Sequence, residues 1–191
     1  MTRIAVGFGS NLGDRRAHLN AGLAALAGHA RLIARSSLFE SAPVGPVEQG
    51  PFLNAVAVFE TDREPAAILS DLLAIELGRG RVREVRWGPR TLDLDLLLYG
   101  DRAVSDPGLT VPHAELTNRR FALEPLLEAW PDARLPDGTP LSAYLGAVAD
   151  QEVDRIGSWY VGWWNLLRWR LRAAGRWLPG NPSGCGNPSG C

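Results

Sequence analysis

The chain has 191 residues, enough to bury the core of one domain and too many for a small fold that depends on disulfides. Hydrophobic residues make up 46% of it and charged residues 21%, which excludes both an intrinsically disordered chain and a membrane-embedded bundle. Its 20 basic residues are all arginine, against 21 acidic residues, so mechanisms that need a lysine base, a Schiff base or a phosphate-binding lysine are excluded.

In chain order, residues 3–9 predict a buried strand, and Asp14 is placed to cap a helix that continues to about His29. Residues 31–40 predict a second strand. A loop follows over residues 41–51, where three prolines and two glycines prevent regular strand pairing.

Residues 52–60 predict a third strand, after which Thr61 or Asp62 can cap a second helix with Pro65 in its first turn. Residues 92–99 predict the fourth strand. The rest of the first 150 residues is expected to form loops and short helices, at residues 119–130 and 141–150. The order strand-helix-strand-strand-helix-strand predicts an α+β fold, a ferredoxin-like βαββαβ sandwich with extra C-terminal elements.

The C-terminal segment differs in composition from the rest of the chain. Residues 151–191 hold five of the seven tryptophans and five arginines against two acidic residues, and they end in two copies of Gly-Asn-Pro-Ser-Gly-Cys. We therefore expect a folded domain over residues 1–150 and an extension over residues 151–191 that lies outside the core. A basic, Trp-rich helix could lie on an anionic membrane, but Trp169 falls opposite its apolar stripe, so we favour a poorly ordered extension.

Two aspartates carry the strongest chemical signal. Residues two apart in a strand share a face and lie about 6.6 Å apart along the chain, so Asp93 and Asp95 should point the same way while the leucines between and after them fill the other face. Such a pair can hold one or two Mg²⁺ ions that clamp the oxygens of a transferring phosphoryl group. The alternative is a solvated outer face of an edge strand.

Arginines crowd the residues just before the two aspartates. They are Arg79, Arg81, Arg83, Arg86 and Arg90. Because the arginine fork matches phosphate oxygens, this loop beside a carboxylate pair indicates a polyphosphate and a metal, with Trp87 as part of a lid over the site. A basic surface loop that neutralises acidic neighbours is the alternative.

Two further patterns are weaker. Phe52 and Asn54 share one strand face, an aromatic plate beside an amide that can donate and accept, which suits a flat heterocycle. Residues 7–13 contain three glycines, but their spacing departs from a dinucleotide fingerprint, and a strand-to-helix turn that needs small residues is the preferred interpretation.

Taken together, these motifs resemble the 6-hydroxymethyl-7,8-dihydropterin pyrophosphokinase family. The resemblance covers residues 1–150. It rests on five segments in the family's order and spacing: Gly9-Ser10-Asn11-Leu12, Phe52-Leu53-Asn54-Ala55, Gly80-Arg81-Val82-Arg83, Arg86 through Asp95, and Leu109-Thr110-Val111-Pro112-His113. It implies a cytoplasmic ATP-dependent enzyme of folate biosynthesis that transfers pyrophosphate to the pterin hydroxymethyl group.

The resemblance also implies roles for individual residues. Asp93 and Asp95 would bind two Mg²⁺ ions that bridge the ATP phosphates, and Arg81 and Arg90 would meet the phosphates in the transition state. The remaining ATP contacts would be Glu76, Arg83, Trp87, Thr110, His113 and Arg119.

The pterin ring would stack between Phe52 and Phe121, with Asn54 on its edge. Its pocket would be bounded by Ser41, Ala42, Val44 and Gly45. The expected partners are ATP and the pterin, with no nucleic acid, and the chain is expected to be a monomer. The competing hypothesis is a non-catalytic pterin-binding or nucleotide-binding module, against which the complete set of metal and phosphate ligands argues.

Overall fold

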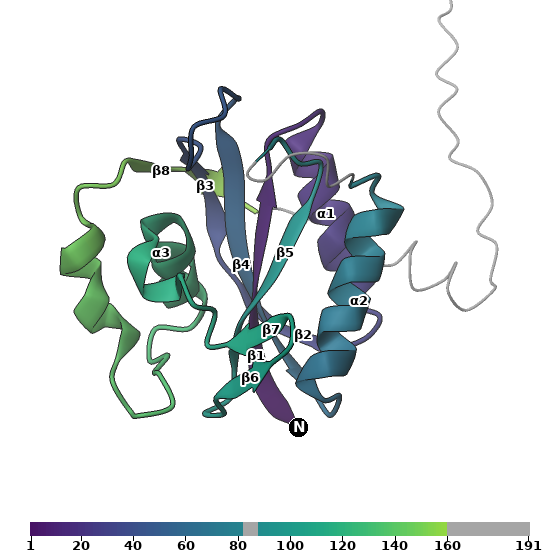
Figure 1. Cartoon of the computed structure of the whole chain (residues 1–191), viewed down its shortest axis with the longest axis vertical. Helices are drawn as coiled ribbons and strands as arrows, with labels where there is room; N and C mark the ends of the chain where they lie inside the picture. Colours follow the sequence, from purple (N-terminus) through teal and green to yellow (C-terminus); the bar gives the residue numbers. More distant parts are fainter. Residues whose placement is uncertain (82–87, 160–191) are drawn as a thin grey trace, which may run out of the picture. The chain divides into compact units, whose positions relative to one another are not determined.

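The computed structural model describes residues 1–81 and 88–159, which form an antiparallel sheet with helices on both faces (Figure 1). The strands of the large sheet are β1 (Thr2–Ser10), β2 (Arg31–Arg35), β3 (Ser37–Ser41), β4 (Phe52–Thr61), β5 (Asp93–Tyr99) and β8 (Val153–Ser158). The helices described are α1 (Arg15–Leu26), α2 (Pro65–Gly78), α3 (Arg120–Ala129) and the 3-10 segments η1 (Leu116–Asn118) and η2 (Leu141–Val148). A separate hairpin joins β6 (Val104–Asp106) to β7 (Leu109–Val111).

The strand order of the large sheet is β5-β1-β4-β3-β8, with β2 also paired to β4. Helices α1 and α2 cover one face and α3 covers the other (Figure 1). The expected mixed fold of helices around an antiparallel sheet is therefore confirmed. This order places β1 between β4 and β5, so the strand with Asn54 and the strand with Asp93 lie on either side of it.

The strand expected at residues 31–40 is divided into β2 and β3 by Ser36. The Ser36 amide donates to the carbonyl of Val56 (2.8 Å), and the Ser36 hydroxyl accepts from the Val56 amide (3.0 Å). A side chain thus replaces one backbone partner in the ladder, and the strand changes register along β4 at this point. Sequence periodicity does not detect such a break, because the break depends on a hydrogen bond to Val56, 20 positions away.

Helix α1 begins as predicted, since the Asp14 carboxylate accepts a hydrogen bond from the Ala17 amide (2.9 Å). The expected cap of α2 at Thr61 or Asp62 is wrong. Glu64 is the N-cap residue, without a side-chain cap bond. Its extended backbone follows from Pro65, because proline disfavours a helical conformation in the residue before it and fits the first helical position.

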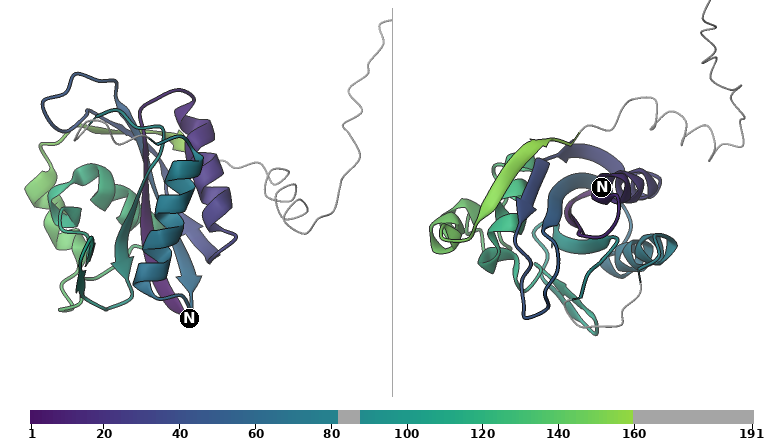
Figure 2. Two further views of the ribbon diagram at one scale, coloured as in Figure 1. Left: turned by 45° about the vertical axis from the view of Figure 1, so that its right-hand side comes forward. Right: turned by 90° about the horizontal axis from the view of Figure 1, so that it is seen from above.

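The domain boundary expected after Asp150 is also wrong, because Val153–Ser158 pairs with β3 as the edge strand β8, beside β3 in the view from above (Figure 2). The first compact unit runs from Met1 to Tyr160. After β8, the Trp159 ring is 2% exposed and meets Phe8 edge-on, with ring centroids 5.1 Å apart. The rest of the extension, including its expected helical stripe, lies outside the described residues.

Glu128 joins α3 to both strands at this edge. Its carboxylate accepts from the amide and hydroxyl of Ser37 on β3 (3.0 and 2.7 Å) and from Arg155 on β8 (3.2 Å). Partial burial acts to raise the pKa of Glu128, but the hydrogen bonds from Ser37 and Arg155 outweigh it, and the pKa lies below its usual range.

Each face of the sheet carries its own core. Leu19, Leu23 and Leu26 of α1 are fully buried, as their spacing predicts, together with Ile68 and Leu72 of α2. On the opposite face, α3 and η2 pack against the sheet through a second cluster. Its members are Ala5, Val56, Leu97, Leu98, Leu116, Leu123, Leu126, Ala133, Leu141 and Val148. Over the part of the chain that the structure describes, no helix has the length and apolar character needed to cross a membrane.

Candidate functional site

A cavity of about 370 Å³ lies between the sheet and the start of α3. Its volume falls in the range of small-molecule sites. The predicted site residues that line it are Ser41, Ala42, Val44, Phe52, Asn54, Arg90, Asp93, Asp95, His113, Arg119 and Phe121. Side chains separated by up to 80 positions in sequence, from Ser41 to Phe121, thus meet in one space.

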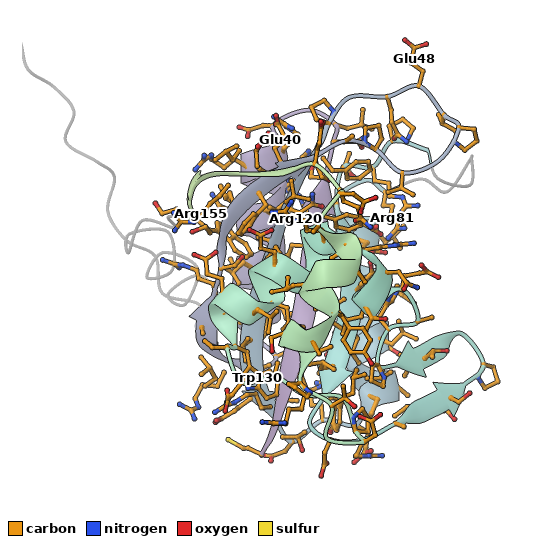
Figure 3. All side chains as sticks on the ribbon, turned by 90° about the vertical axis from the view of Figure 1, so that its left-hand side faces the viewer. Glu40, Glu48, Arg81, Arg120, Trp130 and Arg155 are labelled. Carbon is orange, nitrogen blue, oxygen red and sulfur yellow. The ribbon has the colours of Figure 1, made fainter. Side chains whose placement is uncertain are left out.

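Four predicted residues lie outside the cavity lining: Gly45, Glu76, Arg81 and Thr110. Gly45 is an exposed loop residue with φ of 108°, and Thr110 lies exposed in β7. Arg83 and Trp87, with the expected lid, lie outside the described residues. Figure 3 shows Arg81 toward the end of the sheet that carries the Glu48 loop, with Trp130 at the opposite end.

The two aspartates both reach the cavity from β5, as their spacing predicts. Arg81 forms an ion pair with Oδ1 of Asp93 (2.7 Å), and Arg90 pairs with Oδ2 of the same carboxylate. Burial, and next the negative charge of Asp93, raise the pKa of Asp95, against the opposing effects of His113 and of Arg119 and Arg90.

This donor set fits Mg²⁺. Two carboxylates on one strand face supply the hard oxygen ligands that Mg²⁺ prefers, and a partly buried pair of like charges is stabilised by a cation. Within residues 1–81 and 88–159, no three His, Cys, Asp or Glu side chains come together as a larger cluster. Nucleotide-bound Mg²⁺ usually takes its other ligands from phosphate oxygens and water.

Glu76 contacts β5 from the α2 side of the sheet. It is only 2% exposed, and its Oε1 accepts a hydrogen bond from the amide of Leu94, between the two aspartates (2.7 Å). Since β5 is the edge strand, this amide points away from β1, and Glu76 satisfies it from α2. Glu76 also pairs with Arg81, which in turn pairs with Asp93. These contacts favour a positioning role over the ATP contact that the resemblance implies.

Glu76→Gln tests this role. Glutamine keeps an acceptor for the Leu94 amide but loses the charge that faces Arg81, so we expect a loss of about 1–3 kcal/mol in the free energy of unfolding. We also expect kcat to fall about tenfold while the Kd of Mg-ATP stays within twofold. Thermal melting and steady-state kinetics measure both. A rise in the Kd of ATP with kcat unchanged would instead support a direct contact between Glu76 and ATP.

Asn11 fixes Arg90, a contact that the sequence analysis did not identify. Its side-chain Oδ1 accepts from the Arg90 backbone amide (2.7 Å), and its backbone amide donates to the Arg90 carbonyl (3.0 Å). Its Nδ2 group donates to Gln49 in the loop between β3 and β4 (2.8 Å). One asparagine thus joins Arg90 to the loop that carries Ala42 and Val44. Its place between two loops distant in sequence has no local sequence signal.

The opposite side of the cavity suits a flat, polar ring. Asn54 is 5% exposed, and its Nδ2 group donates to the Ser41 hydroxyl (2.9 Å), which orients the amide. At the start of α3, the Arg119 guanidinium lies 5.8 Å from the centroid of the Phe121 ring. His113 Nδ1 accepts from the Glu115 amide (3.2 Å), which orients the imidazole ring.

One cavity therefore combines a carboxylate pair flanked by arginines with an amide and aromatic rings. This combination defines an enzyme that transfers a phosphate-containing group to a small heterocyclic acceptor. The family model for 7,8-dihydro-6-hydroxymethylpterin-pyrophosphokinase matches residues 5–131.

Two bacterial relatives, both named 2-amino-4-hydroxy-6-hydroxymethyldihydropteridine pyrophosphokinase, match over most of their length. The relative from Pseudomonas aeruginosa is 45% identical over 156 residues, covering 81% of this chain and 96% of its own. The relative from Haemophilus influenzae is 39% identical over 153 residues, covering 79% of this chain and 96% of its own. The chain belongs to the 7,8-dihydro-6-hydroxymethylpterin-pyrophosphokinase family and is a pyrophosphokinase.

Solved structures agree on the fold. Wild-type HPPK-DHPS from Plasmodium falciparum superposes with a TM-score of 0.61 at 13% identity over 76% of this chain. The matched part is 44% of that longer protein, so this chain spans less than half of it. At this identity the likeness concerns the fold alone.

Proposed function

We propose that this chain transfers the pyrophosphoryl group of ATP to 6-hydroxymethyl-7,8-dihydropterin, giving AMP and the pterin diphosphate, a step of folate biosynthesis. The observation that carries the proposal is the meeting in one cavity of Asp93 and Asp95 with Asn54, Phe52 and Phe121. The two aspartates suit metal-bound phosphate, and the amide and the two aromatic rings suit the pterin ring. Family membership over residues 5–131 supports the same reaction.

We also infer a ferredoxin-like arrangement for the core. The support is the strand order β5-β1-β4 followed by β2 and β3, with α1 and α2 on one face. Counting β2 and β3 as one interrupted strand gives the βαββαβ order. The added elements are the β6-β7 hairpin, α3, η2 and β8.

In the reaction, the hydroxymethyl oxygen attacks the β-phosphorus of ATP in line with the leaving oxygen. The new O–Pβ bond forms as the bond from Pβ to the oxygen on Pα breaks, AMP leaves, and the hydroxyl proton passes to solvent. Phosphoryl-type transfer depends mainly on positioning and charge neutralisation. Arg81 and Arg90 both pair with Asp93, which supports the proposal that their guanidinium groups would hold the phosphates.

Asp93 and Asp95 would hold Mg²⁺, with two ions proposed. When bound, Mg²⁺ withdraws charge from the phosphate oxygens and holds them in line. His113 and Arg119, which line the same cavity, would contact ATP, and the roles of Arg83, Trp87 and Thr110 toward ATP stay predictions. The monomeric state and the cytoplasmic location likewise stay predictions.

The direct test is AMP formation by the purified full chain. We expect AMP to appear only when ATP, Mg²⁺ and the hydroxymethyl pterin are all present, in equal amounts to the pterin diphosphate. Pterin binding without AMP formation under these conditions would favour the non-catalytic binding module instead.

Asn54→Ala and Phe121→Ala test the assignment of the pterin side. Each removes a partner of the buried ring, an amide or a stacking face, worth about 1–3 kcal/mol, so we expect the Kd of the pterin to rise about 5-fold to 150-fold. The Kd of Mg-ATP should change less than twofold. Calorimetry with each ligand measures both, and equal losses for the two ligands would indicate general misfolding rather than a pterin pocket.

A further inference from the structure

The central strand of the site, β1, has glycine at two alternating positions on its cavity face. Gly7 and Gly9 of β1 both line the cavity. Between and beyond them, Phe8 and Ser10 are buried, at 2% and 0% exposure. The alternation of a strand thus places side chains on the face toward α1 and bare backbone on the face toward the ligand.

The strand register places this bare backbone between the two halves of the site. Gly9 lies directly opposite Asn54 on β4 and directly opposite Asp93 on β5. Gly7 likewise lies directly opposite Val56 on β4 and Asp95 on β5. Neighbouring strands are about 4.8 Å apart, so the backbones of β4 and β5 lie roughly 10 Å apart on either side of β1. A group that joins the two sides must pass over β1.

The backbone does not require glycine at position 9. Its φ is not among the positive values found at other glycines of the described chain. A Cβ atom added there would lie 3.6 Å from Oδ1 of Asn54, 3.7 Å from Cβ of Asp93 and 3.8 Å from Cδ1 of Phe52, which are ordinary contact distances. Since glycine in a strand costs stability relative to alanine, the fold alone would favour the larger residue.

The reason for glycine therefore lies in what fills the cavity. We propose that Gly9 is a specificity-determining position of this enzyme. Its missing side chain leaves the space through which the hydroxymethyl arm of the pterin reaches from the Asn54 side to the phosphates on the Asp93 side. The proposal rests on the proposed function and adds to it the site that admits the 6-substituent.

Gly9→Ala in the full chain tests this. With Mg²⁺ and a non-hydrolysable ATP analogue present, we expect the Kd of 6-hydroxymethyl-7,8-dihydropterin to rise at least tenfold, and Gly9→Val to bind it still more weakly. The Kd of the Mg-bound ATP analogue should stay within twofold. The melting temperature of Gly9→Ala should equal or exceed that of the parent, because the added methyl group meets no hard clash.

A second pterin distinguishes the contribution of the hydroxymethyl arm to binding from that of the ring. The same dihydropterin without its 6-hydroxymethyl group should lose less than threefold in affinity on Gly9→Ala, since its ring does not extend over β1. Gly146→Ala is the matched control, because a Cβ there meets nothing within 4 Å and the residue is not in the cavity lining. It should leave both pterin affinities unchanged.

An unchanged affinity of Gly9→Ala for the hydroxymethyl pterin would overturn the proposal, as would equal losses for the two pterins. These results differ from a failure of the proposed function. In that case the parent chain itself would form no AMP, whether or not it binds the pterin.

Discussion

Asp95→Asn is expected to lower the rate of AMP formation at least about a thousandfold. A loss of this size corresponds to about 4 kcal/mol of transition-state stabilisation, which removal of a metal ligand accounts for. The fold should survive, because the side chain faces the cavity rather than the leucine core. Burial and the neighbouring charge of Asp93 disfavour the ionised carboxylate in the folded chain, so the asparagine variant should melt at the same temperature or higher without Mg²⁺.

Initial rates across a range of Mg²⁺ concentrations, with thermal melting of the same samples, measure both effects. Asp106→Asn on β6 is a matched control outside the cavity lining and should keep the parent rate. Near-normal turnover of Asp95→Asn at ordinary Mg²⁺ would show that the metal is held elsewhere. A variant that is both inactive and unfolded would show that Asp95 supports the fold.

Trp159→Ala in the full chain is expected to destabilise the protein by about 3–5 kcal/mol, the usual cost of truncating a buried tryptophan. The ring is 2% exposed, contacts Phe8 edge-on and donates from Nε1 to the Asn20 carboxamide on α1 (2.9 Å). For a protein of this size, the melting temperature should fall by about 6–20 °C. Trp159→Phe should recover most of the loss, because it keeps the packing and loses only the hydrogen bond.

Truncations of the chain test independently where the folded unit ends. Ending the chain after Asp150 removes both β8 and Trp159, and we expect this truncation to destabilise the protein at least as much as Trp159→Ala does. Ending it after Tyr160 retains the compact unit, and we expect stability and pyrophosphoryl transfer to be kept. Equal stability of the two truncated chains would show that β8 and Trp159 contribute little.

Local patterns were sufficient wherever neighbours along the chain determine the structure. The spacing of Leu19, Leu23 and Leu26 predicted the buried face of α1, and Asp14 predicted its first turn. These features depend on helical periodicity and on one side chain bonding an amide three residues away. The prediction of the N-cap of α2 failed because Pro65 imposed a stronger local constraint than the polar side chains before it.

Features that depend on distant partners were missed. Strand β8 reads in sequence as part of a polar, basic extension, and only the free edge of β3 makes it a strand. The break at Ser36 exists because its hydroxyl replaces a backbone group opposite Val56. Glu76 could be associated with ATP by resemblance alone, whereas its burial behind β5 depends on how α2 packs.

By itself, the sequence determined the chemical character of the site: two carboxylates on one strand face, a preceding run of arginines, and an amide beside an aromatic ring. Alternation in a strand fixes which side chains share a face, so this much follows from spacing. Tertiary structure alone decided that β1 lies between β4 and β5, and hence that Gly9 lies opposite both Asn54 and Asp93. The physical reason is that strand order and register are set by packing between segments far apart in the chain, which no local pattern records.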